Sequence, residues 1–306
     1  MNISSTKLLH MITGKLLGDG CITRQEGRKP RFQFIHSIND KDWCYYCYEE
    51  LRKGLPLALP HYRKFRDDRT IKGYTESYQV QSRTDPTITW LESLWYSKRK
   101  KVIPFSFLEH FLNEEALAWW YQDDGHLSKV GPIPKKVILS TDNFTPIENR
   151  RLIGLLSRKF CLHFRLDSQN RLILYDQLQI YYFLRLIEPF IHPSMKRKVI
   201  TPNTSSPSFA KKRTTIYLPE SFHLKKPTVE IHKKFPMLPK LTNIVIDRNS
   251  YISFYKDVIA NFSLKEKNKG YQIVIDGQYY YHLQSIKSQT GLSFSQIITI
   301  CFSNNY

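Results

Sequence analysis

Long apolar runs are absent from this 306-residue sequence, because none approaches the ~20 residues of a membrane-spanning helix. The first 11 residues leave no room for a signal or transit peptide before a motif that begins at Ile12. Of only five cysteines, Cys44 and Cys47 alone have paired spacing, so we expect neither a structural zinc nor a disulfide. A P-loop and a GxGxxG motif are also missing, which removes support for nucleotide hydrolysis. These absences predict an intracellular protein without a membrane partner, in the cytoplasm of a bacterium or in an organelle matrix.

Acidic residues are scarce relative to basic ones. The chain has 46 Lys and Arg against 27 Asp and Glu, a formal net charge of +19 and a pI near 9.6. Such an excess favours a nucleic-acid partner over a merely solvated basic surface. The length and the 41% of hydrophobic residues are sufficient for a buried core and for two domains.

Two nine-residue stretches share one pattern. Ile12–Gly20 (ITGKLLGDG) and Leu117–Gly125 (LAWWYQDDG) are mostly apolar runs that end in Asp-Gly, 105 positions apart. Helical periodicity predicts that each acid lies at a helix C-terminus, whose partial negative charge repels it. A divalent cation would offset that repulsion. Gly14 and Gly18 weaken the first helix, and the close approach of a partner backbone is one reason to tolerate them.

The order of elements after the first motif recurs after the second. Each unit reads helix, strands, helix, strands, helix and basic cluster, and the distance from Asp19 to Lys101 (82 residues) resembles that from Asp124 to Lys198 (74 residues). The chain is therefore predicted to hold a diverged duplication related by a pseudo-twofold axis. We expect four segments: a first repeat (1–105), a second repeat (106–205), a basic linker (206–240) and a C-terminal module (241–306).

ITGKLLGDG and LAWWYQDDG resemble the two motif copies of a single-chain LAGLIDADG homing endonuclease of the group I intron-encoded type. The resemblance covers about residues 7–202. It implies an α+β fold, a duplicated αββαββα unit with two DNA-binding antiparallel sheets, followed here by a small C-terminal α/β module. It also implies a monomer that makes a site-specific double-strand break in DNA by metal-dependent phosphodiester hydrolysis.

The same resemblance implies the site residues. In the family the last acid of each motif binds metal, which here means Asp19 and Asp124, with Mg²⁺ as the expected ion and Mn²⁺ as a substitute. The preceding residues, Gly18 and Asp123, are further candidates for the metal site. A helix-end residue that bonds to backbone or to a basic neighbour is an equal interpretation of Asp123.

Lysines near each scissile phosphate match Lys101 and Lys198, which would organise the attacking water or stabilise the charged phosphorane. For Lys198, plain phosphate contact within a basic cluster is the alternative. Gln33 resembles a family position near the reactive water.

Strand alternation predicts which residues face DNA. A solvated polar face is the default interpretation of such residues. The candidate DNA-binding residues are Arg31, Gln33, Thr75, Ser77, Gln79 and Gln81 in the first half, His163 and Arg165 in the second, and Lys211, Lys212 and Arg213 in the linker.

The C-terminal module resembles a ribbon-helix-helix unit, with a strand at 271–275, a helix at 278–289, a turn and a second helix at 294–302. Such folds pair two ribbons, and the earlier Ile244–Asp247 segment is the expected partner strand. A packing module without DNA contact is equally compatible with its small charge.

Two other functions remain open on this fold. One is an intron maturase that binds RNA and assists splicing, and the other is a DNA-binding repressor that has lost cleavage. The intact Asp19 and Asp124 disfavour the repressor, because nothing structural requires two acids at repelling helix ends.

Overall fold

The computed structural model describes residues 3–200, 210–260 and 267–303, which fall into two compact units. The larger unit contains the residues up to Tyr175 together with Ile187–Ile200, and the smaller one contains Asp176–Leu186 with the C-terminal residues. Across these described ranges, every helix is too short or too polar to cross a membrane.

The first half of the larger unit follows the predicted order of elements. Four of its strands form an antiparallel sheet in the order β1-β2-β4-β3, and β5 pairs with β6 separately. The elements are α1 (Ile3–Leu17), β1 (Cys21–Thr23), β2 (Arg31–Ser37), α2 (Lys41–Leu51), β3 (His61–Arg66), β4 (Tyr74–Gln81), α3 (Pro86–Trp95), β5 (Tyr96–Ser97), β6 (Lys100–Lys101) and α4 (Phe105–Phe111).

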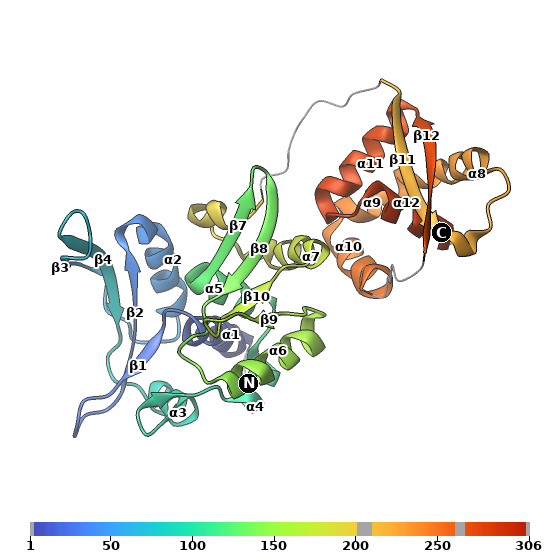
Figure 1. Cartoon of the computed structure of the whole chain (residues 1–306). Helices are drawn as coiled ribbons and strands as arrows, with labels where there is room; N and C mark the ends of the chain where they lie inside the picture. Colours follow the sequence, from blue (N-terminus) through green and yellow to red (C-terminus); the bar gives the residue numbers. More distant parts are fainter. Residues whose placement is uncertain (1–2, 201–209, 261–266, 304–306) are drawn as a thin grey trace. The chain divides into compact units, whose positions relative to one another are not determined.

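The second half repeats this topology. Its sheet has the order β7-β8-β10-β9, again antiparallel, so that corresponding strands occupy corresponding positions (Figure 1). The elements are α5 (Glu114–Asp124), β7 (Gly125–Val130), β8 (Ile133–Leu139), α6 (Pro146–Phe160), β9 (Arg165–Leu166), β10 (Leu172–Leu174) and α7 (Gln177–Ile187). The shared order confirms the predicted α+β fold with two antiparallel sheets.

Local sequence signals explain where these elements begin. The side chain of Asn113 accepts a hydrogen bond from the backbone N–H of Ala116 and so caps α5. Thr145 and Glu148 form a capping box at the start of α6, with Pro146 at the first helical position. Along β2, Phe32, Phe34 and His36 are buried while their neighbours are not, which places the intervening polar residues on the other face.

Helices α1 and α5 pack closely against each other, and a glycine makes this possible. A Cβ atom at Gly14 would lie 2.5 Å from the carbonyl oxygen of Ala116 and 2.5 Å from the Cβ of Trp119. At Gly18 it would lie 2.6 Å from the Cβ of Asp123. The predicted reason for both glycines, close approach of a partner backbone, is therefore what the structure shows.

The smaller unit differs from its sequence prediction in two respects. Residues 206–240 were expected to form a linker, yet Lys212–Pro219 form strand β11, which pairs along its whole length with β12 (Asn268–Ile275). Ile244–Asp247 was the expected partner strand, but Ile244–Ile246 end a helix whose buried face packs under α11. The other elements are α8 (Pro227–Lys234), α9 (Leu238–Ile246), α10 (Arg248–Phe254), α11 (Gly277–Thr290) and α12 (Phe294–Ser303).

Helix α7 belongs by sequence to the second repeat, but residues 176–186 pack with the C-terminal elements. The ring of Tyr182 stacks on that of Tyr255, with centroids 3.7 Å apart. Position 291 is a glycine with φ +76°, and a Cβ there would lie 2.8 Å from the Tyr181 ring. The predicted boundary of the second repeat therefore cuts through a packed unit.

Candidate active site

Asp19 and Asp124 lie together at one open pocket of the larger unit. Asp19 follows the end of α1, and Asp124 is the last residue of α5. The packing of α1 against α5 brings the two motif ends together although they are 105 positions apart. The pocket is lined by both acids and by Gly18, Gly20, Cys21, Tyr96, Arg99, Lys100, Lys101, Val102, Asn143, Phe144, Thr145 and Glu148.

The two acids differ electrostatically. Burial, with the negative charges of Asp19 and Asp123, raises the pKa of Asp124 to about 7. Burial also acts to raise the pKa of Asp19, but a hydrogen bond from His36 and the charge of Lys15 outweigh it and leave that pKa below its ordinary value. A cation in the pocket would therefore stabilise the charged form of Asp124 more than the charged form of Asp19.

Asp123 is held by protein donors on both of its carboxylate oxygens. Oδ1 accepts from Lys15 Nζ at 2.9 Å and from Trp43 Nε1 at 2.8 Å, and Oδ2 accepts from Lys15 Nζ at 3.1 Å and from the Asp19 backbone N–H at 3.2 Å. The side chains of Asp123 and Lys15 are both 0% exposed. Of the two interpretations of Asp123, the structure favours a residue bonded to backbone and to a basic neighbour.

Lys15 extends this network to the first acid through His36. Its ammonium lies 2.7 Å from Nε2 of His36, and Nδ1 of His36 lies 3.2 Å from Oδ2 of Asp19. Because an ammonium only donates, Nε2 must accept and Nδ1 must carry the proton that it donates to Asp19. The resulting chain of hydrogen bonds connects an acid of the second motif to the metal-site candidate of the first.

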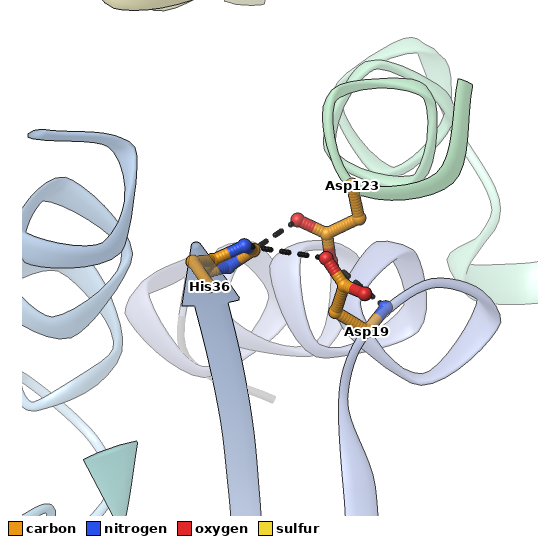
Figure 2. A group of neighbouring side chains, drawn as sticks. All are labelled: Asp19, His36 and Asp123. Carbon is orange, nitrogen blue, oxygen red and sulfur yellow. Dashed lines mark hydrogen bonds and ion pairs between the residues drawn. The ribbon is translucent and has the colours of Figure 1, made fainter. Parts of the chain in front are cut away.

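Asp19, His36 and Asp123 also have ligand atoms within 4.8 Å of one another, as metal sites do (Figure 2). The Lys15 ammonium already contacts two of these three groups, and a divalent ion among them would be repelled by it. Geometry therefore argues against Asp123 as a ligand. The pocket side of Asp19, together with Asp124, therefore stays the predicted metal site.

The residues at the pocket fit such an ion. Two carboxylates at helix ends offer the hard oxygen donors that Mg²⁺ prefers, and burial, followed by the charges of Asp19 and Asp123, raises the pKa of Asp124. Gly18 lines the same pocket and can offer only its backbone carbonyl.

Both predicted lysines approach the motif ends. Lys101 Nζ donates to the carbonyl of Gly20 at 2.8 Å and lines the pocket, and burial lowers its pKa. Lys198 Nζ donates to three carbonyls at the end of α5, those of Tyr121, Gln122 and Asp123, at 3.3, 2.6 and 3.1 Å. Lys198 therefore neutralises the C-terminus that carries Asp124.

The predicted polar residues of the first sheet share one face and are bonded to each other. Gln33 Oε1 accepts from Nε2 of Gln79 and of Gln81, each at 3.1 Å. Arg31 donates to Gln81, and Arg63 of β3 donates to Gln79. Gln33 thus lies in this side-chain network, with its Nε2 3.5 Å from the Cys21 sulfur at the pocket wall. Thr75 and Ser77 continue the same face along β4.

The second sheet presents fewer of the predicted residues. Arg165 is exposed on β9, opposite Ile173 of β10. His163 precedes β9, outside the sheet, and its Nδ1 lies 3.0 Å from the Ser157 hydroxyl at the end of α6. The predicted strand began too early because β9 has only two residues. Lys212 and Arg213 belong to β11 of the smaller unit, and Lys211 forms an ion pair with Asp276 there.

Lys15, His36 and Trp43 were not predicted as site residues. Lys15 interrupts the apolar face of its helix, and His36 follows Phe32 and Phe34 on the buried face of β2. A polar residue on an apolar face was the available signal. Its partner could not be found that way, because Asp123 lies 108 positions from Lys15.

Comparisons with known proteins agree with this geometry. The model of the LAGLIDADG DNA endonuclease family matches residues 9–180. An uncharacterized protein of Methanocaldococcus jannaschii is 31% identical over 199 residues, which cover 64% of this chain and 74% of that protein. The cytochrome b mRNA maturase bI2 of Debaryomyces hansenii is 29% identical over 63% of this chain and 73% of its own length. The intron-encoded endonuclease ai4 of Dictyostelium discoideum is 28% identical over 50% of this chain and 92% of its own length.

A solved structure shares the fold. The homing endonuclease I-WcaI bound to its DNA recognition sequence aligns with a TM-score of 0.56 at 21% identity, over 65% of this chain and 88% of that chain. The family model spans more than half of the sequence, and both motif copies stand at corresponding positions of a duplicated fold. The chain therefore belongs to the LAGLIDADG DNA endonuclease family, with two copies of the motif.

Proposed function

We propose that the chain is a site-specific homing endonuclease that makes a double-strand break in a long DNA target. The observation that carries this proposal is the pairing of Asp19 and Asp124 at one open pocket beside Lys101. Without an ion, the charged form of Asp124 lowers the stability of the fold, as the raised pKa of this carboxyl indicates. Their placement is explained by an ion that binds there.

Asp19 and Asp124 would hold divalent ions, Mg²⁺ with Mn²⁺ as a substitute. When bound, such ions supply Lewis acidity that activates water and stabilises the leaving 3′-oxygen. His36 orients the Asp19 carboxylate, and Lys198 neutralises the helix end that carries Asp124. Lys101 lies in the pocket wall, where its ammonium would stabilise charge that develops on the phosphate.

Double-stranded DNA would lie along the polar faces of the two sheets, one per half. Support comes from the fold shared with I-WcaI, which is described as bound to its DNA recognition sequence. The Gln33–Gln79–Gln81 network and its two arginines supply side chains suited to base edges in the major groove. Residues proposed to contact DNA in the larger unit are Arg31, Gln33, Arg63, Thr75, Ser77, Gln79, Gln81 and Arg165. A single chain contains both halves, so we propose that it acts as a monomer.

The test is cleavage by the purified full chain. With Mg²⁺ it should linearise a plasmid that carries the locus without its insertion, and EDTA should prevent this. Asp19→Asn and Asp124→Asn should each abolish the double-strand break while they leave DNA binding within about twofold. Asp68→Asn, which removes an exposed acid outside the pocket, is the matched control and should cut normally. Full cleavage by the Asp124→Asn protein would refute the mechanism.

A second candidate function is that of an intron maturase. It is favoured by one specific observation, the 29% identity to a protein named as a cytochrome b mRNA maturase. A maturase would bind its intron RNA and promote splicing equally well with Asp19→Asn or Asp124→Asn. Splicing that depends on the protein but not on these acids, without any DNA cleavage, would therefore select this function.

A further inference from the structure

The smaller unit presents a two-stranded ribbon with one covered and one open face. Strands β11 and β12 pair antiparallel through eight residue pairs, from Lys212–Ile275 to Pro219–Asn268. Ile216, Leu218, Ile273 and Ile275 are fully or almost fully buried on the inner face, under the helices. Arg213, Thr215, Tyr217, Gln272 and Val274 are exposed on the other face.

A helix contacts each edge of the ribbon at one position, and the outer face is exposed. The hydroxyl of Ser295 on α12 accepts from the Tyr217 backbone N–H at 2.9 Å, at the edge of β11. Nε2 of His232 on α8 lies 2.9 Å from the carbonyl of Val274, at the edge of β12. A strand from another protein therefore has no free edge to pair with at these positions.

The outer face of the ribbon is nearly symmetric about its central residue pair. Buried residues recur as Ile216-x-Leu218 on one strand and Ile273-x-Ile275 on the other, which centres the ribbon on the Thr215–Gln272 pair. At the pair Tyr217–Gly270, a Cβ on the glycine would come within 3.1 Å of the tyrosine ring. The glycine therefore lets that ring lie across the neighbouring strand.

The chemistry of this face matches DNA bases. Arg, Gln and Thr are the side chains that contact guanine, adenine and thymine edges, and a two-stranded ribbon fits the major groove of B-form DNA. The outward positions from Arg213 to Val274 carry no carboxylate. Residues 206–306 contain 14 Lys and Arg against six Asp and Glu, which favours a polyanion.

We propose that the β11–β12 ribbon is a second DNA-binding site, which inserts its outer face into the major groove of duplex DNA and reads bases through Arg213, Thr215 and Gln272. The site is separate from the two sheets of the larger unit and adds a further block of recognised base pairs. Double-stranded RNA is a poor ligand for such a ribbon, because the A-form major groove is too deep and narrow for it to enter.

The experiment is a selection of DNA by the full chain in EDTA, where cleavage does not occur. The protein is used to enrich a pool of random 60-base-pair duplexes, and wild type is compared with Arg213→Ala/Gln272→Ala. Both side chains are exposed, so circular dichroism and the thermal midpoint should be unchanged. Lys240→Ala, which removes an exposed charge from α9, is the control.

Wild type and Lys240→Ala should enrich the same sequences, with one block of specified base pairs that the double variant no longer selects. On the enriched duplex the double variant should bind at least tenfold more weakly, since a bidentate base contact contributes roughly that factor. An unchanged selected sequence and affinity would overturn the proposal. The proposal would also be overturned if duplex RNA of the same sequence bound as tightly as the DNA and the double substitution weakened both complexes equally.

This readout does not depend on cleavage. If Mg²⁺-dependent cutting fails while the ribbon-dependent block is selected, only the proposed endonuclease activity is refuted. If cutting occurs and the block is missing, the ribbon proposal alone fails.

Discussion

Substitution of Lys15 by methionine tests the network that joins the two halves. The Lys15 ammonium and the Asp123 carboxylate are both fully buried, and their nitrogen and oxygen lie 2.9 Å apart. Burial by itself lowers the pKa of Lys15, but the charge of Asp123 outweighs it and raises that pKa above its ordinary value. Removal of one partner from such a pair leaves an uncompensated buried charge, which costs about 3–5 kcal/mol.

We therefore expect Lys15→Met and Asp123→Asn each to lower the free energy of unfolding of the larger unit by about 3–5 kcal/mol. The loss of unfolding free energy in the double variant should be smaller than the sum of the two single losses by at least ~2 kcal/mol, because neither buried charge then remains. Lys7→Met on the same helix is the control. Its ion pair with Glu50 is long, at 3.8 Å, and the Lys7 side chain is 55% exposed, so its loss should cost under about 1 kcal/mol.

Urea unfolding followed by tryptophan fluorescence is suited to this measurement. All five tryptophans lie between Trp43 and Trp120, within the larger unit, so the signal does not report on the C-terminal unit. Trp43 itself donates to Asp123. A loss below ~1 kcal/mol for Lys15→Met, or single effects that add up to the double effect, would show that the buried pair is not a coupled unit.

Three further predictions concern the pocket and the helix crossing. Asp124→Asn should stabilise the metal-free protein by about 2 kcal/mol at pH 8, less than for a fully buried carboxylate because this one is partly exposed. Since the pKa of Asp124 is about 7 in the fold, the wild type loses stability as the pH rises from about 4 to 7. Urea unfolding at pH 4 should therefore show no stabilisation by the substitution. Gly14→Ala should destabilise the protein by about 1–3 kcal/mol because its Cβ would overlap with α5. The control Gly154→Ala, whose Cβ would meet only an Arg158 nitrogen at 3.5 Å, should stabilise it by up to ~1 kcal/mol. If both substitutions change the free energy of urea unfolding in the same direction, the packing argument is contradicted. Since the pKa of Asp19 is lowered and that of Asp124 is raised, the two DNA strands should be cut at unequal rates. Nicked plasmid should then accumulate in a time course of cleavage. Simultaneous cutting of both DNA strands would count against this asymmetry.

The sequence was sufficient to predict the duplication, because the spacing from each Asp-Gly to its basic cluster is local information repeated twice. Strand alternation likewise identified the polar face that holds Gln33, Gln79 and Gln81, since period two fixes which side chains share a face. The two metal-site candidates, Asp19 and Asp124, do meet at one pocket. Their individual contacts with metal and DNA stay predictions.

Long-range pairing was beyond sequence reasoning. Whether Asp123 faces a metal or a lysine depends on the crossing of α1 and α5, which no local pattern encodes. The tetrapeptide Ile-Val-Ile-Asp shows the same limit, because it ends helix α9 at 244–247 and strand β12 at 273–276. Its β-branched residues suit a strand by propensity, and tertiary packing overrides that preference at the first occurrence.

The contact between Lys15 and Asp123 also limits how the halves can pair. In the alignment of the motifs, Lys15 corresponds to Trp120 and Asp123 to Gly18. Two first halves placed together would bury two ammonium groups opposite glycines, and two second halves would bury two carboxylates without a lysine. Each half is thus complementary to the other and poorly complementary to itself. A symmetric dimer of either half alone would therefore first need a substitution at Lys15 or at Asp123, because each of these charges would otherwise be buried without its partner.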